Sequence, residues 1–181
     1  MSARQVALIR GINVGRAKRI AMADLRATLE RLGYRDVRTL LNSGNVVFTG
    51  GRGTPAAAAT RIEKAIESEL GVSARVTVLT AAELATAIAE NPLRQAADSP
   101  SRFLLAVVRD PADRGKLEPL AKRDWKPEAV ALGTRVAYLW CADGILASAL
   151  GAAVGKALGD GVTARNWTTM LKLSALAQES G

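Results

Sequence analysis

Two short segments, R-G-I-N-V-G at residues 10–15 and L-N-S-G-N-V-V-F at residues 41–48, decide the fold of the first half of the chain. Each segment joins a strand-like apolar run to a turn that contains Asn and Gly. The N-S-G turn lies between two runs rich in β-branched and apolar residues, which is the pattern of a β-hairpin. Together with a strand over residues 5–10, these segments predict a small sheet near the N-terminus.

Two helices and a fourth strand complete this half. Apolar residues recur at helical spacing over residues 22–32, and Gly33 is a typical helix stop. A Thr-Pro pair opens a second helix over residues 54–70, and residues 75–79 alternate as a half-buried strand. The order βαββαβ is that of the ferredoxin-like motif, so the predicted fold class is α+β.

The second half has a related pattern. Thr80 and Glu83 form a capping box that predicts a connecting helix over residues 81–90, followed by a polar linker. The later predicted elements are strands at 102–109, 128–132 and 135–141, and helices at 112–123, 145–157 and 167–178. We therefore expect a ferredoxin-like domain at 1–80, a connecting helix and linker at 81–101, and a second α/β domain at 102–181 with the order βαββα and a final helix.

Composition excludes several classes of function. The 181 residues contain one cysteine and no histidine, so a Ser-His-Asp triad, a zinc site and an internal disulfide are excluded. We expect no metal and no cofactor. No apolar stretch reaches the roughly 20 residues that span a bilayer, and the N-terminus lacks the pattern of a secretory signal. A cytoplasmic location without membrane contact is the expectation.

The positive charge of the chain is concentrated in its first half. Residues 1–80 carry 13 Lys and Arg against 6 Asp and Glu, which gives +7 of the total net charge of +8. Such an asymmetry indicates an anionic partner. The alternative interpretation is that the Arg-rich composition has no functional meaning.

The predicted topology places both Asn-Gly turns at the same end of the first sheet, beside the start of the first helix. Helix N-termini and basic side chains both favour anions. The ligand-binding candidates at this corner are Arg10, Asn13, Arg16, Lys18, Asn42, Ser43 and Asn45. The alternative interpretation is that the Asn and Gly residues only form tight turns.

A third motif, R-N-W-T-T, covers residues 165–169. Arg165, Asn166 and Trp167 are candidates for contacts with a phosphate and a base or ring. The alternative makes Asn166 a helix N-cap and Trp167 a core residue. Cys141 ends an apolar run, and we expect an inert core thiol.

These motifs, with M-x-x-L at residues 22–25 and the hairpin at 37–48, resemble the bacterial family called domain of unknown function 1697. The resemblance covers nearly the whole chain. It implies a ferredoxin-like first half joined to a second α/β part, and it supplies no activity and no catalytic residues. Arg16 departs from the family pattern, which usually has a second Gly there.

Three functions stay open at this point. The first is binding of an anionic ligand, either nucleic acid or a phosphorylated small molecule, at the Arg10–Asn45 corner. The second is an enzyme acting on a phosphorylated or nucleotide substrate, with Ser43, Lys18 and Arg10 as the residues to mutate. The third is a protein-interaction module without a ligand. Catalytic residues are not assigned.

Overall fold

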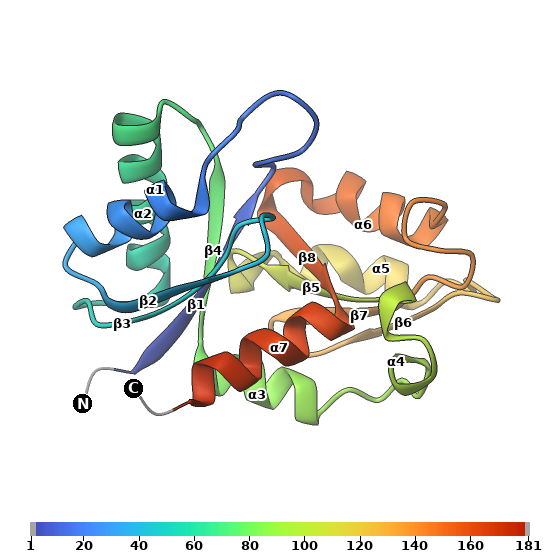
Figure 1. Cartoon of the computed structure of the whole chain (residues 1–181). Coiled ribbons are helices and arrows are strands. Elements are labelled where there is room, and N and C mark those ends of the chain that lie inside the picture. Colours follow the sequence, from blue (N-terminus) through green and yellow to red (C-terminus); the bar gives the residue numbers. More distant parts are fainter. Residues whose placement is uncertain (1–2, 180–181) are drawn as a thin grey trace. The chain divides into compact units, whose positions relative to one another are not determined.

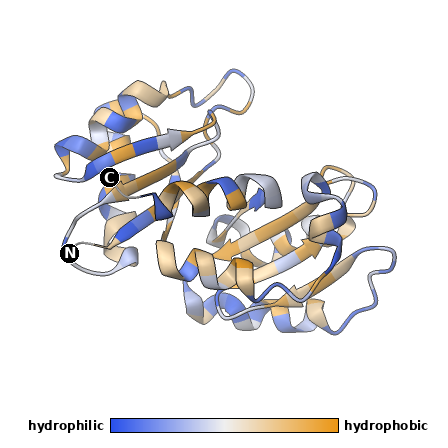
Figure 2. Ribbon diagram, turned by 60° about the horizontal axis from the view of Figure 1, so that its bottom comes forward, coloured by the Kyte–Doolittle hydropathy of each residue, from blue (hydrophilic) through white to orange (hydrophobic). Residues whose placement is uncertain are grey.

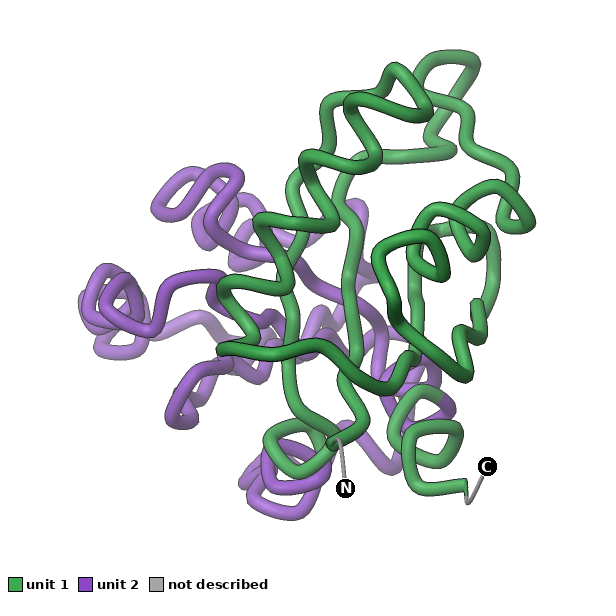
Figure 3. Tube along the Cα trace, turned by 90° about the vertical axis from the view of Figure 1, so that its left-hand side faces the viewer, with its two compact units in different colours: residues 1–84, 173–181 green, residues 85–172 purple. Residues whose placement is uncertain are grey.

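Two four-stranded antiparallel sheets form the framework of the computed structural model, which describes residues 3–179 (Figure 1). The described residues up to Leu84 and from Leu173 onward belong to a first unit, and Ala85–Lys172 form a second (Figure 3). Each sheet has flanking helices, so the α+β class is confirmed. The expected domains at 1–80 and 102–181, joined by a connecting helix and linker at 81–101, stay a prediction.

The first unit has the predicted order of elements. They are β1 (Arg4–Arg10), α1 (Met22–Arg31), β2 (Arg35–Leu40), β3 (Asn45–Thr49), α2 (Pro55–Leu70) and β4 (Arg75–Thr80). The strands lie in the order β2-β3-β1-β4, and β1 pairs antiparallel with both β3 and β4. The second and third strands form the expected hairpin.

Local capping explains where the helices begin and end. Thr54 Oγ1 accepts a hydrogen bond from Ala57 N at 3.2 Å, and Gly71 ends α2 with a left-handed φ of 67°. The backbone N–H of Thr80 donates to Glu83 Oε2 at 2.7 Å, and Glu83 N donates to Thr80 Oγ1 at 3.0 Å. This capping box starts α3 (Ala81–Ala89), as predicted.

The apolar residues of the first unit gather in the strands and the inner helix faces (Figure 2). Ala7 and Ile9 of β1 and Phe48 of β3 are completely buried in a cluster with residues of α1 and α2. The segment of this unit from Leu173 onward contacts its sheet, because Arg4 of β1 donates to the carbonyl of Leu176 at 3.0 Å. The sheet and its helices therefore hold the loops at the strand ends on a rigid base.

The second unit repeats the strand order of the first. Its elements are α4 (Gln95–Asp98), a 3-10 helix (Pro100–Arg102), β5 (Phe103–Val108), a 3-10 helix (Pro111–Leu117), α5 (Glu118–Ala121), β6 (Ala129–Leu132), β7 (Val136–Trp140), α6 (Ala149–Leu158), a 3-10 helix (Gly159–Gly161), β8 (Val162–Asn166) and α7 (Trp167–Gln178), which runs past the unit boundary. The order β6-β7-β5-β8 is the counterpart of β2-β3-β1-β4.

One strand of this unit, β8, was not expected. Residues 162–166 pair antiparallel with β5, so the order is βαββαβ followed by α7, and not βαββα. The segment V-T-A-R-N is short and half polar, and it becomes a strand through its hydrogen bonds to β5. The two units thus have the same topology.

Three other segments differ from their predictions. The helix expected over 112–123 is a 3-10 helix followed by the short α5, because Gly115 and Pro119 interrupt a regular helix. The linker over 91–101 contains α4 and a 3-10 turn. The helix expected over 145–157 begins only at Ala149, where the Ser148 hydroxyl caps it by accepting from Gly151 N.

We predict that Gly44→Ala destabilises the protein strongly. Gly44 has a φ of +85°, and a Cβ there would lie 2.9 Å from both Cβ and the carbonyl oxygen of Ile9. The free energy of unfolding should fall by about 2–4 kcal/mol in urea denaturation. Gly15→Ala is the control, because Gly15 has a φ of +65° and open space around it, and should cost about 1 kcal/mol. Equal losses of unfolding free energy in the two variants would contradict the close approach of Gly44 to Ile9.

Candidate functional site

The two Asn-Gly segments meet in the structure, at one end of the first sheet. Asn13 Nδ2 donates to the carbonyl of Asn42 at 2.7 Å, and Ile9 N donates to the carbonyl of Gly44 at 2.8 Å. These bonds join the β1–α1 loop, residues 11–21, and the end of β1 to the hairpin turn, residues 41–44. The predicted convergence of the two segments is therefore confirmed.

Asn13 shapes the β1–α1 loop. Its Nδ2 also donates to the carbonyl of Ile20 at 2.8 Å, its Oδ1 accepts from Ile20 N at 2.8 Å, and its own N–H donates to the carbonyl of Lys18 at 3.0 Å. The residue adopts a φ of +55°, which Asn tolerates better than most residues. Both amide hydrogens are used inside the protein, so this candidate serves the loop conformation.

Asn45 is likewise a structural residue. Its side chain is completely buried, and Nδ2 donates to the carbonyl of Leu40 and to Ser43 Oγ, both at 2.9 Å. These bonds close the hairpin turn and place Asn45 out of reach of a ligand. Asn42 and Ser43 are exposed at the turn.

An exposed surface remains on the β1–α1 loop and the turn. Arg16, Lys18 and Arg19 are exposed, whereas Arg10 is only half exposed. Val14 is 73% exposed and Leu41 56% exposed, so two apolar side chains also lie at this surface. We call the following residues the loop surface: Val14, Arg16, Lys18, Arg19 and Leu41. In Figure 1 the loop extends beyond the strands of its own sheet.

The start of α1 contributes less positive potential than the sequence suggested. Asp24 lies in the first turn of α1, and the N-cap, Ala21, makes no side-chain hydrogen bond. A carboxylate in the first turn offsets the helix dipole. The positive charge at this corner therefore comes from the basic side chains of the loop.

The second unit provides an internal comparison for this corner. Val108 N donates to the carbonyl of Arg135 at 3.0 Å, which is the counterpart of the bond from Ile9 to Gly44. Only residues 109–110 separate β5 from the next helix, whereas residues 11–21 separate β1 from α1. Arg135 also donates through Nε to the carbonyl of Val108 and through Nη2 to that of Arg109, both at 3.0 Å. The connection after the first strand is thus long and basic in the first unit and short in the second.

The R-N-W motif lies in the second unit and is largely structural. Asn166 Oδ1 accepts from Thr169 N at 2.9 Å, which confirms it as a cap of α7. Trp167 is 7% exposed and packs edge-on against Phe103, with ring centroids 5.3 Å apart. Arg165 is half exposed and donates to the carbonyl of Ala164 at 3.0 Å. The buried indole of Trp167 is not available for stacking on a base.

Cys141 is a core thiol, as expected. It is completely buried, and burial raises the pKa of its thiol, although a hydrogen bond with Ser148 acts in the opposite direction. Among the described residues there is no cluster of three or more Cys, Asp or Glu that could hold a metal ion. No helix in that part of the chain is long and apolar enough to cross a membrane.

The exposure of two apolar residues in the loop surface, Val14 and Leu41, was not predicted from the sequence. Leu41 directly follows β2 and has a left-handed φ of +60°, whereas Val14 lies between Asn13 and Gly15 in the β1–α1 loop. Glycine and asparagine near both residues were the only sequence signal for such a turn.

Comparisons with known proteins agree with this architecture. A sequence model of the family described as "Protein of unknown function (DUF1697)" matches residues 2–138, which include the loop surface. No curated protein matches the chain significantly. Among solved structures, the conserved bacterial protein SP0830 from Streptococcus pneumoniae covers 98% of this chain and 100% of its own, with a TM-score of 0.80 and 22% sequence identity. This likeness concerns the fold alone.

We predict that Asn13→Gly loosens the corner. Glycine keeps the positive φ but removes three side-chain hydrogen bonds, so the free energy of unfolding should fall by about 1–3 kcal/mol. Asn42→Ala is the control, since the bond to Asn42 uses its backbone carbonyl, and should change stability by less than about 0.5 kcal/mol. Chemical denaturation measures the free energy of unfolding of both variants. An unchanged value for Asn13→Gly would refute the structural role of Asn13.

We predict slow modification of Cys141 by a thiol reagent in the native protein. Burial shields the sulfur and its raised pKa lowers the thiolate fraction, so the rate at pH 8 should be at least about tenfold below that of the unfolded chain. The release of thionitrobenzoate reports the rate. Equal rates in the native and unfolded states would show that the thiol is accessible.

Proposed function

The chain belongs to the DUF1697 family of proteins of unknown function, and we propose that it binds polyanions through the loop surface. The ligand class is a phosphate backbone, with nucleic acid as its most general form. One observation carries the proposal: Arg16, Lys18 and Arg19 project from a loop that Asn13 holds in one shape.

The charges of these residues are available to a ligand. None of Arg16, Lys18 and Arg19 forms an ion pair with any residue that the structure describes. They lie in the half of the chain that carries +7 of the net charge, so the long-range field and the local cations have the same sign. Neutralising phosphates with such cations releases counterions, which supplies affinity without base-specific contacts.

A fixed loop also lowers the entropic cost of binding. The β1–α1 loop is tied at Asn13 to Ile20 and to the hairpin turn, so its basic side chains project from an ordered backbone. Ordering a mobile loop would otherwise oppose association. A cytoplasmic location, where nucleic acids and phosphorylated metabolites are abundant, is part of the proposal.

A protein partner is the second candidate, and Val14 and Leu41 favour it. Two large apolar side chains exposed beside basic residues fit an interface with an acidic, partly apolar surface. The enzyme hypothesis has less support, because the chain contains no histidine and the Ser43 hydroxyl accepts a hydrogen bond from Asn45. Binding is therefore the function that the geometry favours.

We predict that Arg16→Gln/Lys18→Gln/Arg19→Gln weakens binding of a fluorescent single-stranded oligonucleotide. The wild type should bind with a Kd of roughly 1–100 µM in low salt, with affinity falling steeply as salt rises. Removing three phosphate contacts should reduce the slope of log K against log[salt] by about 2. Fluorescence anisotropy at several salt concentrations provides both quantities.

The matched control is Arg26→Gln/Arg52→Gln/Lys64→Gln. These three residues are exposed in the same unit, and their replacement changes the net charge by the same amount. The control should keep most of the affinity and the salt slope. Equal losses in the two triple variants would show that net charge alone drives binding, and would contradict the proposed site. No binding by the wild type at low salt would overturn the polyanion proposal altogether.

A further inference from the structure

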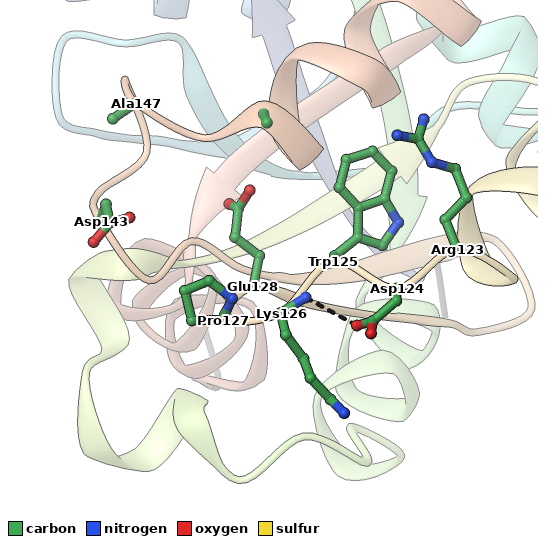
Figure 4. A pocket seen from close by; sticks show the side chains of 9 residues that line it. Arg123, Asp124, Trp125, Lys126, Pro127, Glu128, Asp143 and Ala147 are labelled. Carbon is green, nitrogen blue, oxygen red and sulfur yellow. Dashed lines mark hydrogen bonds between the residues drawn. The ribbon is translucent and has the colours of Figure 1, made fainter.

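A cavity of about 380 Å³ lies in the second unit, whereas the loop surface belongs to the first (Figure 4). Its walls are two segments, residues 123–128 before β6 and residues 143–149 after β7. Ala129 pairs with Trp140, so the segments leave the sheet at the same end. The volume is within the range of small-molecule sites.

Glu128 holds the two walls together. Its Oε2 accepts from Ser148 Oγ at 2.5 Å, and its Oε1 accepts from Leu150 N at 3.1 Å at the start of α6. The Ser148 hydroxyl in turn accepts from Gly151 N at 2.9 Å. Bonds of this kind fix both walls before any ligand arrives, so the cavity is preformed.

Trp125 is the aromatic surface of the cavity. Its Nε1 donates to the carbonyl of Leu120 at 2.7 Å, and its ring packs against the core of the second unit while remaining partly exposed. The guanidinium carbon of Arg123 lies 4.3 Å from the ring centroid. The indole thus already receives one cation in the geometry of a cation–π contact.

Carboxylates approach the cavity from both walls. Asp124, Glu128 and Asp143 line it, and none of them forms an ion pair with a described residue. The Lys126 side chain points away from Glu128 and Asp143 (Figure 4). Arg123 and Lys126 also line the cavity, so it has three carboxylates against two cations and a small negative balance on a chain of net charge +8.

We propose that this cavity binds a small organic cation, a primary ammonium or guanidinium compound. The cationic group lies between the indole of Trp125 and the Asp143 carboxylate, and its carbon chain contacts Pro127, Ala147 and Ala149. Arg123 occupies part of the same aromatic surface and competes with the ligand. The inference is independent of polyanion binding, because it concerns another unit and a ligand of opposite charge.

Isothermal titration of the full chain with agmatine, which carries both cationic groups, tests the proposal at low salt. Wild type should bind with a Kd below about 10 mM, whereas succinate should not bind. Asp143→Asn removes an exposed carboxylate and should weaken binding about fivefold. Arg123→Gln removes the competing cation and should strengthen binding about threefold, an effect that a structural role would not produce.

Asp98→Asn is the matched control, since Asp98 is an exposed carboxylate of α4 outside the cavity. It should bind agmatine as wild type does, and so should the triple variant of the loop surface. Absence of agmatine binding by the wild type, or equal affinity in wild type, Asp143→Asn and Arg123→Gln, would overturn the proposal. Near-UV circular dichroism of each variant confirms that the fold is intact.

Discussion

The amide of Asn13 is the interaction on which the corner of the first unit depends. It binds Ile20 through both its oxygen and its nitrogen, and it reaches the carbonyl of Asn42 across the sheet end. Gly44 lets the hairpin turn lie close to Ile9, because no side chain fits between the turn and Ile9. One polar side chain and one missing Cβ therefore convert a long loop into an ordered surface.

The two units show how one topology acquires different surfaces. Both contain βαββαβ with the same strand order, and both tie the first strand to the hairpin turn by the same backbone bond. In the second unit, Arg135 caps the strand end with its guanidinium and the connection is short. In the first, the connection is long and directs its cations outward. A fold of this kind supplies the base, and loops such as residues 11–21 supply the function.

Local patterns predict those features that local chemistry determines. The Thr54 cap, the Thr80–Glu83 capping box and the hairpin follow from residues close together in the chain, and the structure confirms them. β8 escapes prediction because distant pairing with β5 creates it. At the candidate site, the sequence identifies the polar residues but not whether their side chains are buried or exposed to solvent. Asn45 faces inward, whereas Arg16 is exposed to solvent.

Contact between the loop surface and a polyanion can be observed by titrating the ¹⁵N-labelled protein with a short single-stranded oligonucleotide. Amide resonances record where the ligand binds without any change to the sequence. We expect the largest chemical-shift changes on residues 11–21 and 41–44, and added salt should reverse them. Changes confined to other residues, or no changes at low salt, would contradict it.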